Sequence, residues 1–155
     1  MKERELFKDN RGISGVVVAM LLTVIGIAGV VILWTVVLPM LYSIDFEIVD
    51  VKLEVVEKPG GQKSYQVSIQ IWNTGTIDIT SLKIDCSDIG LNNKELLEQG
   101  ETLNKGERIN FVITEGFSEF KVGTPYTIIV RAEGRSPFGV LRKTDRSITA
   151  TAVRD

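Results

Sequence analysis

The hydrophobic positions divide the chain into two unlike parts. No charged residue occurs between Gly12 and Ile44, and nearly every residue from Ile13 to Ile44 is apolar or small. After Ser43, apolar and polar residues alternate, which is typical of half-buried strands. The sequence therefore predicts one long hydrophobic helix over residues 13–44 and an all-β head over residues 45–155.

The apolar segment is longer than a membrane crossing requires. A helix over residues 13–44 measures roughly 48 Å at ~1.5 Å per residue, whereas the hydrocarbon core of a bilayer is ~30 Å thick. Residues 16–38 contain fifteen Leu, Ile or Val residues, and at ~0.3–0.6 kcal/mol each they favour insertion by several kcal/mol. No polar stripe marks the segment as the core helix of a soluble domain.

Small residues within the helix suggest contact with other helices. Gly15 and Ala19 are four positions apart, a spacing that lets helices approach closely in an apolar medium. Glycine is also simply common in membrane spans, so this reading has a plain alternative. Proline removes a backbone donor, and we expect Pro39 to kink or end the helix and to act as a hinge. The residues expected to pack in a helix bundle are Gly15, Ala19, Val24, Gly26, Ile27 and Gly29.

The head reads as six to eight short strands separated by turn signals such as Pro59-Gly60-Gly61. The alternation slips near Val49, which predicts a β-bulge. Residues 92–99 are expected to form a loop or a single helical turn. The pattern favours an immunoglobulin-like β-sandwich. The apolar positions that define strands are Phe46, Ile48, Val51, Leu53, Val55; Tyr65, Val67, Ile69, Ile71; Ile77, Ile79, Leu82, Ile84, Cys86; Ile109, Phe111, Ile113; Tyr126, Ile128, Val130, Ala132; and Val140, Leu141, Ile148, Ala150, Ala152.

Three aromatic residues of the head have two readings each. Phe117 and Phe120 fall in an expected loop, where they either cap the core or form a surface that contacts a neighbouring molecule. Trp72 precedes a turn and is expected more often at the rim of the core than in a binding site.

Charge predicts orientation and excludes some partners. Four cations lie in the first eleven residues, and the first cation after the apolar segment is Lys52. The positive-inside rule then places residues 1–12 in the cytoplasm and the head outside. The formal net charge of −2 gives no basic footprint for nucleic acid. The apolar core is about twice the length of a secretory signal peptide's, so we expect the head to stay attached.

The composition does not indicate an enzyme. The chain has no histidine, which removes the commonest general base and metal ligand. Cys86 is the single cysteine; it reads as a small buried strand residue, with an intermolecular bridge or a reactive thiol as the alternatives. No nucleotide-binding loop or Gly-x-Ser-x-Gly elbow occurs. We expect no catalytic site, no cofactor and no metal.

A short charged stretch leads directly into the apolar segment, in the run Lys8-Asp9-Asn10-Arg11-Gly12-Ile13-Ser14-Gly15-Val16-Val17. This run resembles the class III signal of archaeal type IV pilins and archaellins. In that family a short charged leader ends in a basic residue and a glycine, and a membrane prepilin peptidase cuts after the glycine. Carried over, Arg11 is the basic residue, and the cut falls between Gly12 and Ile13, before Ser14. Residues 1–12 would then be a leader peptide. Val17 stands where bacterial pilins usually carry a glutamate, as is common in archaea.

The resemblance implies a filament subunit. It implies self-assembly into a helical homopolymer, with the prepilin peptidase, an assembly ATPase and a platform protein as partners. The precursor would lie in the cell membrane, and the product would be an extracellular filament on the cell surface. An adhesion pilus is the first expectation, and an archaellum filament is the second.

Two other readings remain open at this point. The helix could stay in the membrane as an anchor while the head binds a surface layer or an archaellum stator ring. An enzyme or a solute-binding lipoprotein is the last alternative. It would need a pocket chemistry that the sequence does not show, and Cys86 is far from the membrane segment.

Overall fold

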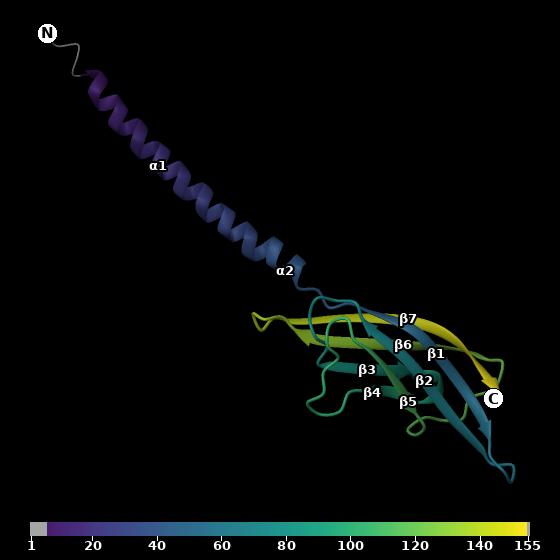
Figure 1. The fold of residues 1–155 in the computed structure, drawn as a ribbon. Coiled ribbons are helices and arrows are strands. Elements are labelled where there is room, and N and C mark those ends of the chain that lie inside the picture. Colours follow the sequence, from purple (N-terminus) through teal and green to yellow (C-terminus); the bar gives the residue numbers. More distant parts are fainter. Residues whose placement is uncertain (1–5, 155) are drawn as a thin grey trace. The chain divides into compact units, whose positions relative to one another are not determined.

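The computed structural model describes the backbone of residues 6–154 and the side chains of residues 14–154. Within that part, the chain forms two compact units: a helical unit that ends at Leu41 and a β unit that begins at Tyr42. Figure 1 labels the helices and strands of both units. The expected layout of one long N-terminal apolar helix followed by a β-rich head is confirmed.

The helical unit is continuous but changes its winding once. Helix α1 runs over Leu6–Ile32, a π-helical segment (η1) follows over Leu33–Val37, and helix α2 covers Leu38–Leu41. The N–H of Leu38 donates to the carbonyl of Leu33, a bond that spans five residues instead of four. Pro39 has no N–H to offer the carbonyl of Thr35, so the wider turn lies where proline disturbs the α-helical ladder. The helix ends two residues after Pro39.

The β unit is one continuous sheet of seven strands in the order β4-β3-β6-β7-β1-β2-β5. All neighbouring strands are antiparallel except β1 and β7, which run parallel. The strands are β1 (Phe46–Glu57), β2 (Lys63–Asn73), β3 (Ser81–Cys86), β4 (Leu91–Glu95), β5 (Arg108–Ile113), β6 (Pro125–Arg135) and β7 (Leu141–Arg154), with a 3-10 turn η2 (Ser87–Ile89) between β3 and β4.

Strand β7 connects the two halves of the sheet. It pairs with β6 from Leu141 to Thr151 and reaches β1 only through its last residues, Ala152, Val153 and Arg154. The sheet curls so that both halves bury their side chains in one core cluster, with Leu53 and Ile69 from one half and Leu82 and Ile128 from the other. Because the described strands join in one curled sheet, the immunoglobulin-like sandwich is not confirmed.

Several predictions for the head are confirmed in detail. The pairing of β1 with β2 slips between Ile48 and Asp50, which is the predicted bulge at Val49. Cys86 is buried at the end of β3. Phe120 belongs to the core, and Phe117 stacks on it with ring centroids 5.9 Å apart, so these two rings cap the core.

Other predictions were wrong at strand boundaries. The expected loop or helical turn over 92–99 begins as strand β4. This strand forms one edge of the sheet and exposes Asn92 and Asn93, so it lacks the alternating apolar residues that reveal an inner strand. The third expected strand starts at Ser81; Ile79, before it, makes only an isolated bridge to Leu103.

Candidate functional site: the exposed helix and the adjoining end of the head

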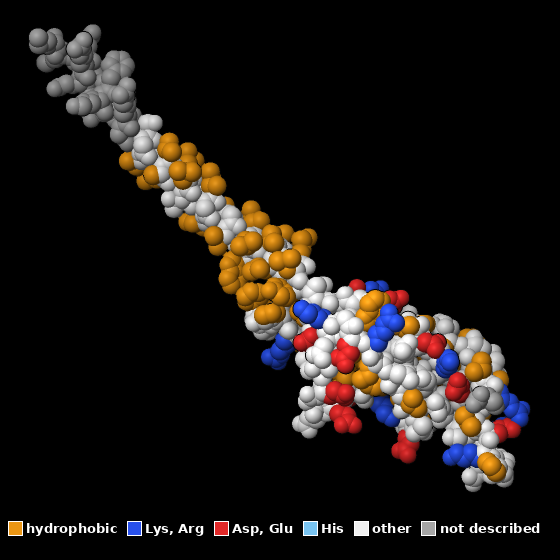
Figure 2. Space-filling model, viewed as in Figure 1, with side chains coloured by type: hydrophobic (Ala, Val, Ile, Leu, Met, Phe, Trp, Pro, Cys, Tyr) orange, Lys and Arg blue, Asp and Glu red, His pale blue; other side chains and the backbone are white. Residues whose placement is uncertain are grey.

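The most prominent feature of the described chain is an exposed apolar surface along the helical unit. The helix over Ser14–Leu41 has 28 residues, is apolar enough to cross a membrane, and buries none of its residues inside the chain. Met20 and Ile25 are each 65% exposed, and Trp34 is 57% exposed. Figure 2 shows hydrophobic side chains along this segment, in contrast to the mixed charges of the head. Such a surface requires lipid or another protein surface around it.

The predicted packing residues fall on different sides of this helix. At about 100° per residue, Gly15, Ala19, Gly26 and Gly29 lie within roughly 80° of one another around the axis. We call these four residues the small-residue face. Val24 lies on the opposite side, about 180° from Gly15. A Cβ added at Gly15, Gly26 or Gly29 would meet no atom of the chain within 4 Å, so the small-residue face is open.

The small-residue face extends the four-residue spacing of Gly15 and Ala19 along the helix. Gly26 and Gly29 continue it, with Leu22 completing a series separated by steps of four and three residues. Such a series follows one stripe along a helix. Small residues on a stripe let two helix backbones come close in an apolar medium.

The polar groups inside the apolar segment are satisfied by the helix itself. The Thr23 hydroxyl donates to the carbonyl of Ala19 at 2.9 Å, and the Thr35 hydroxyl donates to the carbonyl of Val31 at 2.7 Å. These bonds remove the cost of placing a free hydroxyl in lipid or in a dry helix bundle. Both hydroxyls are therefore compatible with either environment.

The predicted processing site lies inside α1, just before the apolar segment. Arg11, Gly12 and Ile13 are on the helical backbone of α1, and their side chains lie outside the described residues. Ser14 is the first residue whose side chain is described, and it is exposed. Whether the chain is cut between Gly12 and Ile13 stays a prediction.

The chain is held firmly to the head soon after the helix ends. Ser43 donates its N–H to Thr76 Oγ1 at 2.9 Å, and Thr76 returns its own N–H to the Ser43 carbonyl at 3.0 Å. Gly75 donates to the Asp45 carbonyl at 2.9 Å. A Cβ at Gly75 would lie 2.6 Å from the Asp45 nitrogen, so only glycine fits. The chain is therefore fixed to the head from Ser43 onward, and the role of Pro39 as a hinge remains a prediction.

Asn73 organises this contact from inside the head. Its side chain is fully buried; Nδ2 donates to the carbonyls of Ile77 at 3.0 Å and Leu103 at 2.9 Å. Its Oδ1 accepts the N–H of Gly75 at 3.0 Å. The sequence indicated only a turn here, because an asparagine in a turn usually satisfies its own backbone. The bond with Gly75, two residues on, is of this local kind. The bond to Leu103, 30 positions away, could not be foreseen from the pattern.

Trp72, the preceding residue, packs on the outer side of the same turn. The Arg108 guanidinium carbon lies 4.3 Å from its ring centroid, and its indole N–H donates to the Gly106 carbonyl at 3.2 Å. Arg108 therefore packs on the face of the half-buried indole ring, and the Gly106 carbonyl accepts the hydrogen bond of the indole N–H. These contacts indicate a structural role for Trp72.

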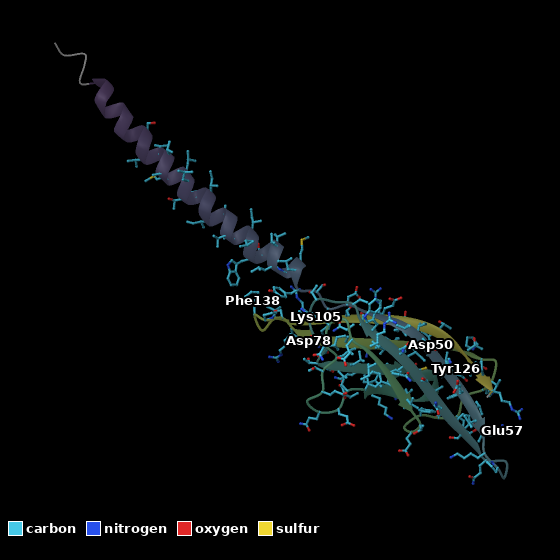
Figure 3. The ribbon with its side chains drawn as sticks, viewed as in Figure 1. Asp50, Glu57, Asp78, Lys105, Tyr126 and Phe138 are labelled. Atoms are coloured by element: carbon cyan, nitrogen blue, oxygen red, sulfur yellow. The ribbon has the colours of Figure 1, made fainter. Side chains whose placement is uncertain are left out.

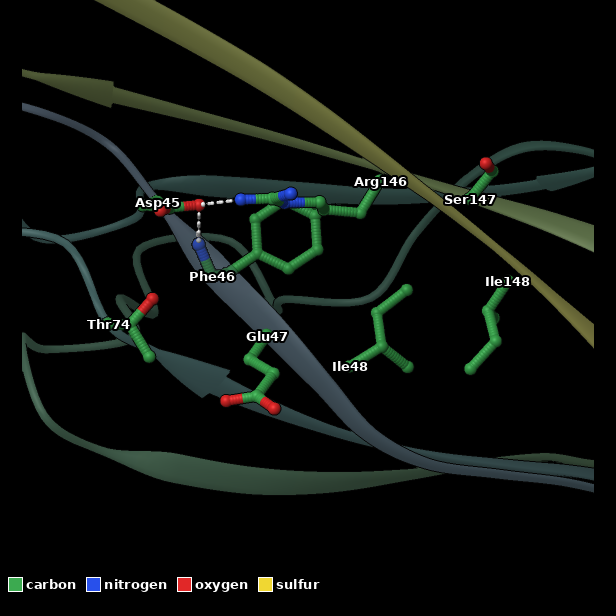
Figure 4. Close-up of a pocket in the computed structure, with 8 residues that line it drawn as sticks. All are labelled: Asp45, Phe46, Glu47, Ile48, Thr74, Arg146, Ser147 and Ile148. Carbon is green, nitrogen blue, oxygen red and sulfur yellow. Dashed lines mark hydrogen bonds and ion pairs between the residues drawn. The ribbon is translucent and has the colours of Figure 1, made fainter.

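A groove opens where β1 and β7 diverge from their short contact. It has a volume of about 370 Å³ and is lined by Asp45, Phe46, Glu47, Ile48, Thr74, Arg146, Ser147 and Ile148. Figure 4 shows the ion pair of Arg146 with Asp45 at one side of this β1–β7 groove. The hydrogen bond from Arg146 lowers the pKa of Asp45, burial opposes this, and the N–H of Phe46 adds to the lowering.

The groove offers little chemistry beyond this pair. Arg146 Nη2 lies 2.8 Å from Asp45 Oδ1, so each charge is already matched by the other. Among residues 14–154, no group of three or more His, Cys, Asp or Glu side chains is placed to hold a metal ion. Burial raises the pKa of the Cys86 thiol, so this thiol is poorly nucleophilic at neutral pH.

Comparison with known proteins adds no family assignment: the sequence matches no protein family, and no curated protein matches it. By its architecture, the chain belongs to the class of proteins in which a single N-terminal helix capable of crossing a membrane is joined to a β-rich head.

Proposed function

We propose that this protein is the structural subunit of an archaeal type IV filament, with an adhesion pilus as the first choice. The observation that carries the proposal is the 28-residue apolar helix, exposed on all sides and placed ahead of a separately folded head. In this proposal the helices pack together into the filament core, the heads coat the outside, and the protein has no catalytic role.

The physical argument starts from the solvent. Outside a bilayer, the helix would expose large apolar side chains such as Leu21, Leu22 and Ile25 to water. Burial of apolar surface contributes about 25 cal/mol per Å², so stacking many copies into a bundle is strongly favoured. The open small-residue face, together with the exposed aliphatic side chains around it, provides the packing surface.

Processing belongs to the same proposal. A leader that carries Lys8 and Arg11 next to the helix would place unpaired charge in the bundle, and burying such charge costs several kcal/mol. Removal of residues 1–12 by a prepilin peptidase, with the cut after Gly12, leaves Ile13 as the new N-terminus. An assembly ATPase and a platform protein would then extract the subunit from the membrane into the extracellular filament.

A charge inside the helix distinguishes insertion into a membrane from assembly into a filament. Val24→Asp costs about 2.5–3.5 kcal/mol in a bilayer, less than the several kcal/mol contributed by the remaining aliphatic residues. The variant should therefore still insert as a precursor but fail to assemble; a charge at Ile27 should do the same. Val24→Leu is the matched control and should assemble normally. Electron microscopy of sheared surface fractions distinguishes the results, and normal filaments from Val24→Asp would exclude the bundle.

Processing is tested at the cut site. Gly12→Leu should leave a longer, membrane-bound precursor and no filament, whereas Asn10→Ala in the same leader should be processed. N-terminal sequencing and intact mass of the sheared fraction give the answer. Material that begins at Ile13 supports the proposal, and surface filaments that retain residue 1 would contradict it.

The second candidate is a membrane-anchored surface protein, such as an archaellum accessory component. The favouring observation is that Ser14–Leu41 is long enough to cross a bilayer without any partner helix. In that case Val24→Asp and Gly12→Leu would leave function unchanged, and the protein would be found only in membranes.

A further inference from the structure

The hairpin between β6 and β7 ends in an exposed apolar tip. Phe138, Val140 and Leu141 are 52%, 50% and 46% exposed, although each is a large hydrophobic residue. Elsewhere in β7, exposed positions such as Lys143, Asp145 and Thr149 are polar, with Val153 near the end of the strand as the exception. Contiguous exposed hydrophobic residues at one turn usually mark a contact with another apolar phase.

The tip is a turn closed by backbone and side-chain hydrogen bonds. The N–H of Ser136 donates to the Val140 carbonyl at 3.0 Å, and the N–H of Gly139 donates to the Ser136 carbonyl at 2.8 Å. Ser136 Oγ accepts the N–H of Val140 at 3.2 Å. Gly139 has φ 77°, a conformation that glycine adopts without strain. The exposed side chains are therefore presented by a fixed backbone.

The flanks of the tip are basic. Arg135, Arg142 and Lys143 are three cations within residues 133–143, against the single acid Glu133, which gives a net charge of +2. Lys143 pairs with Glu133 at 2.6 Å, whereas Arg135 and Arg142 form no ion pair with any described acidic side chain. Apolar residues flanked by arginines match the interface of a bilayer, where hydrocarbon lies next to phosphate headgroups.

The tip also lies next to the point where the chain leaves the apolar helix. The rings of Tyr42 and Phe138 meet edge to face, with centroids 5.6 Å apart. Tyr42 directly follows Leu41, the last residue of the membrane-capable segment. A membrane that covers this segment up to Leu41 therefore has its surface next to Tyr42, and hence close to Phe138. Tyr and Trp are the side chains enriched at that depth.

We propose that the β6–β7 hairpin tip docks into the lipid interface of the membrane that holds the helix, with Phe138, Val140 and Leu141 among the upper acyl chains and Arg135 and Arg142 at the phosphates. This inference rests on the membrane-inserted precursor of the proposed function. It gives the head a second attachment to the membrane besides the covalent one, and leaving the membrane for a filament then requires release of the tip.

The end of the head opposite the β6–β7 tip provides a control position for a test. In Figure 3, Phe138 and Glu57 lie at opposite ends of the head. Gln62 lies in the turn that follows β1, and it is exposed. Strand β1 has 12 residues, so at about 3.3 Å per residue its far end is roughly 36 Å from Phe46. If the β6–β7 hairpin tip faces the membrane, a probe at Gln62 should therefore lie in water.

The experiment measures the depth of a nitroxide spin label in the full chain, reconstituted in vesicles. Val140→Cys, Gln62→Cys and Ala28→Cys are labelled in turn, and the relaxation by dissolved oxygen is compared with that by a water-soluble nickel chelate. Ala28 lies inside the apolar helix and calibrates the hydrocarbon. We expect the label at Val140→Cys about 5–10 Å inside the headgroup boundary, and the label at Gln62→Cys in water.

The perturbing variant is Arg135→Gln in the Val140→Cys background. It should move the label towards water in vesicles with anionic lipids, and have a smaller effect in phosphatidylcholine vesicles. If the Ala28→Cys label lies in hydrocarbon while the Val140→Cys label is as accessible to nickel as Gln62→Cys, docking is overturned and the membrane-inserted helix stands. If the Ala28→Cys label is itself in water, both proposals fail.

Discussion

Asp45 and Arg146 lie 101 positions apart in the sequence, and the Arg146 guanidinium approaches Asp45 Oδ1 to 2.8 Å. The pair joins the start of β1 to the middle of β7, at a level where the two strands no longer share backbone hydrogen bonds. It is therefore a side-chain link across the open part of the β1–β7 groove, next to the site where the chain enters the head.

This link gives a pH-dependent stability. The hydrogen bond from Arg146 lowers the folded-state pKa of Asp45 below its ordinary 3.8. The stabilisation is thus complete above pH 3.8 and is lost as the pH falls through the lowered pKa. Asp45→Asn should lower Tm at pH 7 by roughly 2 °C, since the pair is largely exposed. The difference from the parent chain should vanish in strong acid, as measured by thermal unfolding in detergent micelles.

A second ion pair provides the control for this effect. Asp50 and Lys52 are 3.8 Å apart, and their side chains are each 56% exposed. Asp50→Asn removes a β1 carboxylate whose cation lies 3.8 Å away, at the outer limit of an ion pair, and it should change Tm much less than Asp45→Asn does. Equal losses from Asp45→Asn and Asp50→Asn would mean that the net charge, and not the Arg146 contact, sets the stability.

Asn73 should matter more than any surface charge. Asn73→Ala removes three hydrogen bonds of a buried side chain. It leaves the Ile77 carbonyl without this partner, whereas the Leu103 carbonyl and the Gly75 N–H each keep a backbone hydrogen bond. A lost hydrogen bond costs about 1 kcal/mol and a buried unsatisfied group ~1–3 kcal/mol, so the free energy of unfolding should fall by about 3 kcal/mol. Tm should fall by about 10 °C or more. Urea unfolding followed by tyrosine and tryptophan fluorescence measures the change.

Asn110→Ala is the matched control for Asn73→Ala. Asn110 is exposed on β5 and accepts a bond from the Ser68 hydroxyl at 3.2 Å. Its removal should change the unfolding free energy by less than about 0.5 kcal/mol. If both asparagines proved equally dispensable, the buried bonds of Asn73 would carry no net stability.

Cys86 should behave as an inert thiol. It is 1% exposed, and burial raises its pKa above the ordinary 9.0, which keeps it protonated at neutral pH. A thiol reagent should label the native chain far more slowly than the same chain in denaturant. The exposed Gln62→Cys variant serves as the positive control. Fast native labelling of Cys86 would reveal local opening of the end of β3.

The sequence predicted the elements that depend on local pattern. The uncharged residues from Gly12 to Ile44 identified the helix, and the alternation from Tyr65 to Ile71 identified β2. The slip at Val49 identified the bulge, because an extra residue shifts every later side chain to the other face. These features are encoded within a few neighbouring positions.

The features that the sequence did not predict depend on contacts between distant segments. The edge strand β4 has polar side chains such as Asn92 and acquires its conformation by pairing with β3. The parallel contact of β1 with β7 joins Leu53 to Ala152, and no local pattern encodes it. The exposed Phe138 tip was also missed: within the strand pattern, Val140 and Leu141 looked like part of a core strand.

The small-residue face makes a prediction that separates packing from hydrophobicity. Gly26→Leu and Val24→Leu introduce the same side chain on opposite sides of the helix. In the single chain both are harmless, because no atom lies within 4 Å of a Cβ at Gly26 and Val24 is 63% exposed. Leucine also forms helix better than glycine, by ~1 kcal/mol in soluble peptides, and it inserts into bilayers at least as well as valine.

Only an assembly can therefore distinguish the two variants. A leucine at Gly26 would hold a neighbouring backbone away from the small-residue face, and the loss of close packing removes the dispersion contacts that hold apolar helices together. Filament yield should fall at least about tenfold for Gly26→Leu, equivalent to ~1.4 kcal/mol per subunit contact, and remain near the parent level for Val24→Leu. Electron microscopy and quantitative immunoblots of sheared material measure both. Equal yields would show that helices in the filament do not meet through Gly26.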